Sequence, residues 1–371
     1  DTATTEIYTL SLHDALPICS ERGQCVTTPS TRSGAGSDTL MYVFNFENND
    51  GFSVIAANRA VDPVLAVAEK GNYTYGEPTG VENFDFYMDA MAQSLAVIKP
   101  PKFDTIRTTP KFKTVEVNES RSCDPLIPVR WGQRSPYGDY CSNGYSGCVA
   151  TAIAQIMAYY RFPSSFTTTY TDAPHAGETI ALNWTSIISY PYVYQVPALM
   201  REIGQRVEMT YHPIDENDME TGSSAFSYMA PDCLISFGYS CASGLASYEI
   251  ASIRTNLDET HPVYVRANDI SEGGHAWIAD GYIYSRIGTE YYEEILIDNG
   301  LTLYYDYILT NSTVQTTNLV HYNWGWNGSC DGYFAPGDGV ASGNGYIFNG
   351  LQMITSIRLP RIDSNLNQDF L

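Results

Sequence analysis

The chain has 371 residues, enough for one large domain and a smaller one. Hydrophobic residues make up 44% and charged residues 17% of the sequence, and this balance excludes a disordered or coiled-coil protein. The formal net charge of −22 argues against nucleic-acid or anionic-membrane binding, because both require a basic surface, and it favours solubility outside a cell.

Residues 1–37 are expected to be an artefactual or disordered leader. Within them, Ser11–Ile18 resembles the translation of a sequencing-adapter read. On this interpretation the natural start, with its signal peptide, is missing, so Cys19, Cys25 and His13 are left out of the reasoning. The alternative is a genuine, poorly structured leader.

Residues 38–98 predict a small α+β domain. Two strands are joined by the turn sequence Asn48-Asn49-Asp50-Gly51, and a third strand and an amphipathic helix follow. The strands are expected at Met41–Phe46, Gly51–Ala57 and Val64–Ala68, and the helix at Phe84–Val97. Residues 99–122 are rich in Pro, Thr and Lys without periodicity, so they predict a linker.

Residues 123–371 predict a larger domain in which helices precede strands. Such an order is typical of an α+β fold with an antiparallel sheet. Helices are expected at Val149–Tyr160, Leu199–Tyr211, Ser223–Phe237 and Ser247–Thr260. Strands are expected at Val263–Ala267, Ala276–Ile283, Glu293–Ile297, Thr302–Ile308, Leu319–Trp324 and Gly332–Phe334. The sequence has no run of eighteen apolar residues, so no membrane span is expected.

The eight cysteines include no Cys-x-x-Cys pair, which argues against a zinc ribbon or a thioredoxin-type motif. Their spacing dictates no disulfide framework. Pairing of Cys233 with Cys241, and of Cys123 with Cys141, remains open.

Cys148 directly precedes the helix predicted from Val149 and follows a glycine. The free N–H groups and the dipole of a helix N-terminus favour thiolate over thiol. Gly147 allows a substrate backbone to approach closely. An inert buried thiol is the alternative interpretation, since free cysteine often behaves as a small core residue.

His275 opens a predicted strand after Gly273 and Gly274, so its side chain can project from a strand edge into a cleft. A cysteine nucleophile needs such a base, which takes the thiol proton and returns it to the leaving amine. The alternative is a core histidine with satisfied hydrogen bonds, which is the interpretation kept for His175, His212, His261 and His321.

Two further segments complete a possible catalytic set. Asn323 is a candidate to orient the imidazole, and Trp324 is a candidate to shield that hydrogen bond from water. Gln133 offers an amide donor that, with the Cys148 backbone N–H, could hold a developing oxyanion. For Trp324 and Trp326, core packing is the alternative.

The order Gln, Gly-Cys with a helix, Gly-His with a strand, then Asn-Trp-Gly-Trp is that of papain-like enzymes. More specifically, the chain resembles the streptopain family of bacterial cysteine peptidases, which includes the interpains. The resemblance covers residues 123–359, and it rests on Trp131-Gly132-Gln133, Pro136-Tyr137, Gly147–Met157, Gly273–Ala276, Asn323–Trp326, Asp331–Phe334 and Gly343–Gly350. The papain family's own local cysteine signature is absent.

The resemblance implies a papain-like catalytic domain at 123–371 that needs no metal or organic cofactor. It implies a Cys148–His275 dyad, Gln133 in the oxyanion hole and Trp324 beside the histidine. Substrate contacts are implied for Gly274 and Trp326, and for the loop segment Gly222-Ser223-Ser224. It also makes 38–98 an inhibitory propeptide that keeps the histidine out of place until removed, and 99–122 the processing region.

The chain departs from the family at residues 283–320, which are longer than expected and predict one extra hairpin. The resulting hypothesis is a secreted cysteine endopeptidase zymogen that acts on proteins or peptides. A binding or inhibitor module with the same fold, and an acyl- or amide-transferring enzyme with the same dyad, are the alternatives. The first of these predicts loss of Cys, His or Gln, and all three are present.

Overall fold

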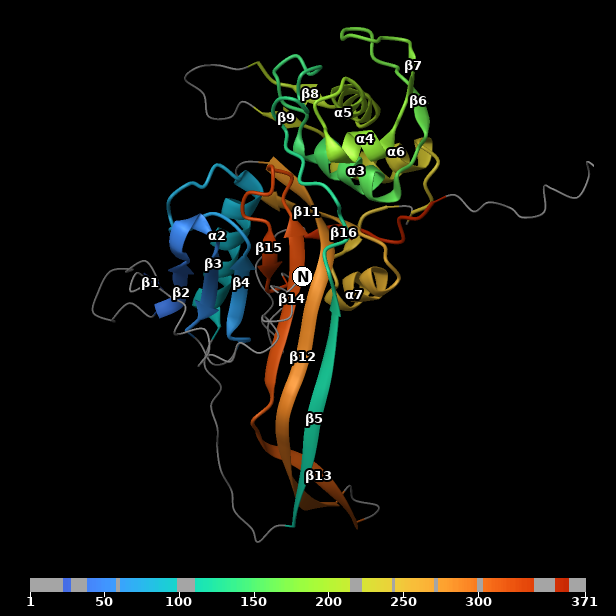
Figure 1. Cartoon of the computed structure of the whole chain (residues 1–371). Helices are drawn as coiled ribbons and strands as arrows, with labels where there is room; N and C mark the ends of the chain where they lie inside the picture. The colour runs from blue at the N-terminus through green and yellow to red at the C-terminus, as the bar shows by residue number, and fades with distance from the viewer. Residues whose placement is uncertain are drawn as a thin grey trace, which may run out of the picture.

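The computed structural model describes residues 23–27, 39–57, 61–98, 111–213, 222–241, 244–269, 273–298, 303–336 and 351–359. Within them the chain forms a small N-terminal unit, a helical lobe and a sheet lobe with a long projecting arm (Figure 1). The Gly-rich stretch Gly343–Gly350 and most of the predicted leader lie outside the described residues.

The N-terminal unit is an antiparallel sheet of four strands with one helix, α2 (Glu82–Val97), packed on it. The predicted strands and turn are confirmed, and Gly51 adopts φ +111°, where an added Cβ would lie 2.1 Å from the Ala68 carbonyl oxygen. The strands are β1 (Gly23–Thr27), β2 (Thr39–Asn45), β3 (Phe52–Ala56) and β4 (Val64–Ala68), and the short 3-10 turn η1 (Glu47–Asn49) joins β2 to β3. Strand β1 lies inside the segment predicted to be a leader and pairs with β2, so that prediction does not hold for residues 23–27.

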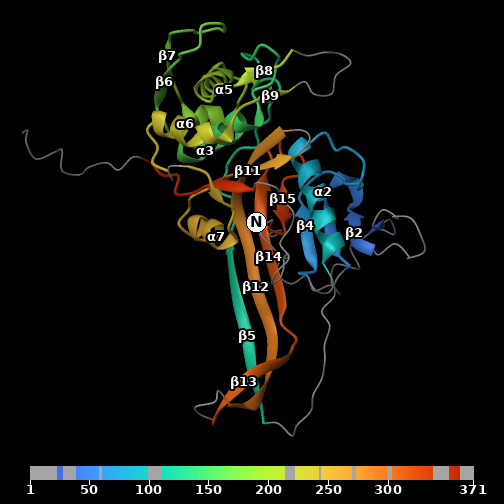
Figure 2. The ribbon, with the colours of Figure 1, turned by 180° about the vertical axis from the view of Figure 1, so that it is seen from behind.

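This small sheet is continuous with the sheet of the larger domain. Strand β4 pairs antiparallel with β15 (Gly332–Phe334), with Ala68 opposite Gly332 and Ala66 opposite Phe334. The combined sheet has twelve strands. Figure 2 shows β4 beside β15 at the junction. Gly332 makes this junction possible, because a Cβ there would lie 2.3 Å from the Val67 carbonyl oxygen. The N-terminal unit is therefore joined to the larger domain by backbone pairing as well as by side chains.

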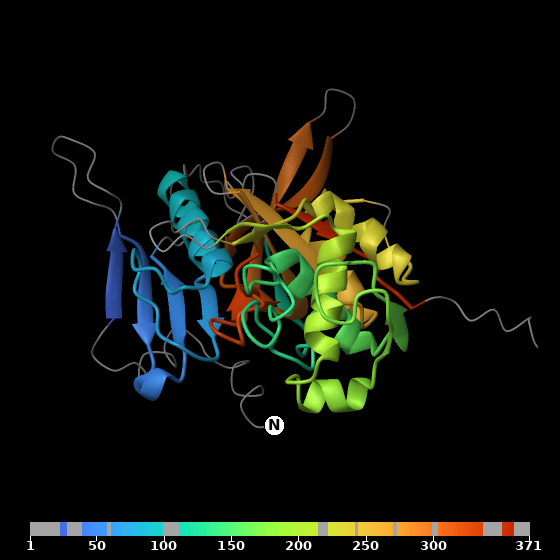
Figure 3. The same ribbon diagram turned by 90° about the horizontal axis from the view of Figure 1, so that it is seen from above.

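Helix α2 lies between the two halves of this sheet (Figure 3). Its apolar face buries Phe84, Tyr87, Met88, Met91 and Leu95 in the same core cluster as Trp277 and Trp324 of the larger domain. Apolar burial on this scale is the main favourable contribution to docking of the unit.

The helical lobe is built around α3 (Cys148–Tyr160), in which every residue from Val149 to Ala158 is buried. A helix that is apolar all round must be covered on every side. The remaining helices and short strands supply that cover. They are β6 (Ser165–Thr167), β7 (Thr179–Ala181), α4 (Trp184–Ser189), α5 (Gln195–Arg206), β8 (Thr210–Tyr211), β9 (Ser223–Ser224), η2 (Ser227–Met229) and α6 (Ala230–Ser236).

The sheet lobe follows and confirms the predicted antiparallel α+β arrangement. It contains β10 (Ala246–Ser247), α7 (Ile250–Asp258), β11 (Val263–Asp269), β12 (Gly273–Asp298), β13 (Leu303–Ser312), β14 (Gln315–Asn323) and β16 (Gln352–Ile354). The two strands predicted at Ala276–Ile283 and Glu293–Ile297 form one strand of 26 residues, β12. Its distal half and β13 form the extra hairpin predicted within 283–320.

The projecting arm corrects the linker predicted over 99–122. Residues Phe112–Cys123 form strand β5, which pairs along its whole length with β12, from Phe112 opposite Glu293 to Cys123 opposite Tyr282. Most of its side chains are exposed, so no apolar alternation marks the strand in the sequence. Pairing with β12, rather than burial, holds it in place.

The cysteines at 123, 141, 148, 233, 241 and 330 are all free thiols, so neither disulfide left open by the sequence is formed. Among the described residues, no helix has the length and apolar character needed to cross a bilayer.

Candidate active site

Cys148 is the first residue of α3. Its predecessor Gly147 has φ +83°, and a Cβ at that position would lie 2.8 Å from Met209 Cε and 3.2 Å from Ser223 Cβ. Only glycine fits this close approach in the left-handed region. Thr151, one turn later, donates to the Gly147 carbonyl oxygen at 3.0 Å and fixes the entry of the chain into the helix.

The Cys148 thiol faces the start of β12. Loss of water around the sulfur raises its pKa, and the nearby carboxylate of Glu82 raises it further. The backbone N–H of Ala276 hydrogen-bonds to the sulfur and acts in the opposite direction, as do the N–H groups at the start of α3. In this form burial dominates, so the thiol is held in its protonated, weakly nucleophilic state.

His275 precedes Ala276, so the structure brings the predicted base and the predicted nucleophile to the same place. His275, on β12, lies opposite Ala267 of β11 in the antiparallel pair. The imidazole packs against the ring of Phe86 from α2, with 6.2 Å between ring centroids. One neighbour of this imidazole is thus a residue of the N-terminal unit.

The first turn of α2 covers the site. Asn83 is fully buried, and its Nδ2 donates to the carbonyl oxygens of Ala276, at 2.9 Å, and Trp324, at 3.3 Å. Glu82 lies within electrostatic range of Cys148, and Phe86 contacts His275. The first turn of α2 therefore packs beside both members of the predicted dyad.

Gln133 is buried near the start of α3. The backbone carbonyl oxygen of Gln133 accepts from the backbone N–H of Ser146, two residues before Cys148, at 2.9 Å. Two residues earlier, the Trp131 N–H donates to Gln155 Oε1 at 2.9 Å. The segment that carries the predicted oxyanion donor is therefore held beside the nucleophile from both sides.

The polar side chain of the Asn-Trp-Gly-Trp segment forms its hydrogen bonds within the larger domain. Asn323 Oδ1 accepts from Gln155 Nε2 at 2.9 Å and from the Gly325 N–H at 3.1 Å, and Asn323 Nδ2 donates to Val129. Both lone pairs of this oxygen are thus used within the lobe interface rather than toward an imidazole. Its role as orienter stays a prediction.

Trp324 is fully buried and donates from Nε1 to the Cys330 carbonyl oxygen at 2.9 Å. Its ring packs against Tyr87 of α2, with centroids 5.6 Å apart, and against Trp277 at 5.3 Å. Trp326 packs at the edge of the same cluster, and its Nε1 has no hydrogen-bond partner among the described residues. In this form both indoles serve the core and its contact with α2.

The predicted substrate loop lies next to the nucleophile. Ser223 contacts Gly147 and donates from Oγ to the Tyr145 carbonyl oxygen at 2.8 Å, while Gly222 accepts from Asn143 at 3.0 Å. Ser224 pairs with Thr210 in the small sheet of β8 and β9. Gly274, next to His275 in the chain, is exposed at the start of β12.

A buried charge cluster links the N-terminal unit to the larger domain, and the sequence analysis did not predict it. His321 Nδ1 lies 2.6 Å from Asp280 Oδ1, and Glu69 of the N-terminal unit lies 3.6 Å from His321 Nε2. Burial opposes the charge on His321, but Asp280 outweighs it and the pKa rises to about 10. The adjacent His321 side chain lowers the Glu69 pKa to about 2, whereas burial raises that of Asp331 to about 7. His321 is a buried core histidine whose Nδ1 is paired with Asp280, but its Nε2 has no hydrogen-bond partner within 3.5 Å among the described residues, so the expectation of a fully satisfied histidine does not hold.

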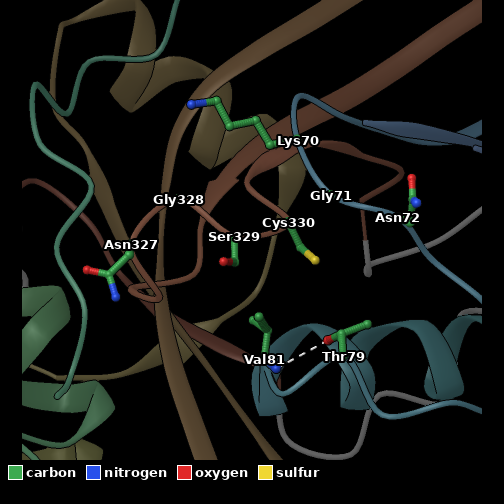
Figure 4. A pocket seen from close by; sticks show the side chains of 9 residues that line it. All are labelled: Lys70, Gly71, Asn72, Thr79, Val81, Asn327, Gly328, Ser329 and Cys330. Atoms are coloured by element: carbon green, nitrogen blue, oxygen red, sulfur yellow. Dashed lines mark hydrogen bonds between the residues drawn. The ribbon is translucent and has the colours of Figure 1, made fainter. Parts of the chain in front are cut away.

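A cavity of about 290 Å³ lies at the junction of the two units, and Cys148 is not among the residues that line it. Figure 4 shows that Thr79 and Val81 line it from one side and Ser329 and Cys330 from the other. Burial raises the Cys330 pKa to about 12. This thiol is therefore a poor competitor for the role of nucleophile.

The sequence matches the family model described as the Peptidase C10 family over residues 131–334. The chain belongs to the Peptidase C10 family. The match contains Gln133, Cys148, His275 and Asn323. A second model, described as the Spi protease inhibitor, matches residues 11–95 and thus contains β1 to β4 and most of α2. This C10 member is a cysteine peptidase zymogen with an inhibitory N-terminal propeptide.

Similar proteins agree with this assignment. Streptopain of Streptococcus pyogenes is 24% identical over 367 residues, covering 84% of this chain and 80% of the relative. The thiol protease/hemagglutinin PrtT of Porphyromonas gingivalis is 25% identical over 354 residues, covering 83% of this chain and 36% of the relative. Prointerpain A of Prevotella intermedia has a similar fold, with a TM-score of 0.53, 20% identity and coverage of 90% of this chain and 98% of the other.

Proposed function

We propose that this C10 zymogen becomes a secreted endopeptidase in which Cys148 attacks the peptide carbonyl carbon. His275 accepts the thiol proton, and the oxyanion binds the Cys148 N–H and the Gln133 side chain. His275 then donates its proton to the leaving amine as the C–N bond breaks. Water, deprotonated by His275, hydrolyses the thioester, and the sulfur leaves as a thiol.

One observation carries this proposal: the Cys148 sulfur, at the start of α3, accepts a hydrogen bond from the N–H of the residue that follows His275. Helix N–H groups and the β12 N–H stabilise a thiolate. Departure of α2 removes the Glu82 charge and admits water to the sulfur. Both changes lower the pKa of the thiol, so the same displacement opens the cleft and activates the nucleophile.

Substrate proteins or peptides would lie between the loop of Gly222, Ser223 and Ser224 and the exposed Gly274. Neither segment presents a large side chain to the cleft, so an extended main chain can approach both sides. Trp326 and Trp324 are proposed to border this cleft once α2 has left. The net charge of −22 supports a soluble, secreted enzyme.

The maturation cut is proposed between Ile98 and Lys111, upstream of β5. Cutting near residue 123 instead would remove β5 and expose the paired edge of β12. Charge pairs support its retention: Lys111 lies 3.3 Å from Glu294, and Glu119 lies 3.8 Å from Arg286. The predicted mature start at 123 is therefore revised in this proposal to one that keeps β5.

The test compares the purified full chain with its Cys148→Ala variant by intact mass over time. We expect the first alone to shorten, to hydrolyse casein and to be blocked by a thiol-directed peptidase inhibitor. A parent chain that stays at full length and ignores casein and the inhibitor would contradict the proposal. Product analysis with an added amine nucleophile separates hydrolysis from acyl transfer, because a transferase would yield mainly the amide.

A further inference from the structure

Gln155 is a buried amide on the same face of α3 as Cys148, two helical turns further along. Its neighbours in the helix are almost all apolar, and it is fully buried. A buried amide is costly unless its polar atoms are bonded, so its partners explain its presence. Those partners belong to two segments that the proposed mechanism uses.

The two ends of the amide have distinct partners. Oε1 accepts from the Trp131 backbone N–H at 2.9 Å, and Nε2 donates to Asn323 Oδ1 at 2.9 Å. A backbone N–H can only donate, so the orientation of the amide is fixed. Asn323 in turn receives the Gly325 N–H and donates to Val129, at 3.1 Å each.

These bonds connect the segment Trp131-Gly132-Gln133, which carries the proposed oxyanion donor, to the helix that carries the nucleophile. Trp131 is anchored through Gln155, two turns along α3, and Gln133 is anchored through Ser146, just before α3 begins. Gly132 between them is enclosed by the Asn327 side chain, 2.6 Å from where a Cβ would be. The segment has little room to shift relative to Cys148.

We propose that Gln155 is a positioning residue that sets the distance between the Gln133 donor and the oxyanion formed at Cys148. This inference rests on the proposed function. Without the amide, Trp131 N–H and Asn323 Oδ1 lose a partner and the segment shifts. Misplacement by about 1 Å can cost about 100-fold in rate.

The experiment uses Gln155→Met and Gln155→Glu in the full chain, matured by a trace of parent enzyme that is then removed. The control is Asn256→Leu, which deletes another buried side-chain amide, in α7. The Oδ1 atom of Asn256 accepts from the Ser356 N–H at 2.7 Å. For Gln155→Met we expect kcat for a peptide amide to fall about 10- to 100-fold with a small change in KM. For Asn256→Leu we expect kcat within about twofold of the parent.

Two readouts separate positioning from general damage. Alkylation of Cys148 by iodoacetamide does not use the oxyanion hole, so its rate in Gln155→Met should stay within about twofold of the parent. Gln155→Glu serves if the Met variant does not fold. When protonated, its carboxyl group can accept from Trp131 and donate to Asn323, so its kcat should approach the parent at acid pH and fall as it ionises.

Unchanged kcat in a folded Gln155→Met variant would overturn the proposal, as would alkylation slowed by the same factor as kcat. A Gln155→Glu variant with the pH profile of the parent would also overturn it. Inactivity of the parent enzyme itself would instead contradict the proposed function, so the two failures are distinguishable.

Discussion

The arm makes a specific prediction about maturation, because it places the two ends of the processing region far from the active site. Helix α2 begins beside Cys148 and carries the chain about 22 Å away by Val97, at 1.5 Å per residue. At the other end, the Lys111 carbonyl oxygen is bonded to the Glu294 N–H. That point is about 60 Å along β12 from His275, at 3.3 Å per residue.

The segment from Ile98 to Lys111 spans at most about 45 Å when fully extended. If a bond in this segment entered the active site of its own chain, the segment would have to reach back about 22 Å to the end of α2 and about 60 Å to the start of β5. These distances add up to about 80 Å. The β5 anchor alone lies farther from His275 than the segment can reach, so the first cut is made by another molecule, one whose own α2 has left its active site, as long as β5 is paired. Figure 1 shows the start of β5 at the end of the arm remote from α3.

The assay is the half-time of shortening at several concentrations of freshly purified zymogen. We expect tenfold dilution to lengthen the half-time about tenfold, as for a bimolecular reaction. The Cys148→Ala zymogen should be cut at the same bond by added mature enzyme, and should remain intact alone. A half-time that does not change on dilution would refute the geometric reasoning.

Three further predictions concern the docked propeptide. Tyr87→Ala removes a buried ring that packs against Trp324, so it should weaken docking of the propeptide by about 3 kcal/mol. We expect faster alkylation of Cys148 in the uncut chain, and an unchanged alkylation rate would contradict this prediction. Gly332→Ala should also loosen the propeptide, through a clash with the β4 backbone, yet leave kcat of the mature enzyme unchanged; a matching loss of kcat would show a different role. Glu69 has a lowered pKa, so the stability that it contributes is fully present above about pH 4.5 and is lost as the pH falls toward about 2. Glu69→Gln should therefore reduce the acid-induced fall in the melting temperature of the zymogen. Equal dependence of the melting temperature on pH in the variant and the parent would contradict this prediction.

The parts of the fold that the sequence predicted are those with strong local signals. Strands β4 and β15 begin and end at the predicted residues, and α3 differs by one residue. The site segments around Cys148 and His275 were found because glycine, a reactive side chain and an element boundary coincide. Each of these signals depends only on neighbours in the sequence.

The parts that the sequence did not predict depend on distant partners. Strand β5 has solvent on most of its surface, so its strand character comes from pairing with β12. Glu69 and His321 meet only because β4 joins β15, and nothing near either residue indicates the other. Gln155 did offer a signal, since a single amide in an apolar helix must find partners, but those partners could not be named without the fold.

The central claim, that Cys148 is the nucleophile of this C10 zymogen, is tested most directly by locating a covalent label. The full chain is matured, treated with a thiol-directed peptidyl inhibitor, digested and examined by peptide mass analysis. The account predicts one equivalent of label on Cys148, with activity lost in proportion and with no labelling of the uncut zymogen. Loss of activity with the label on another cysteine, or hydrolysis by the Cys148→Ala variant, would contradict it.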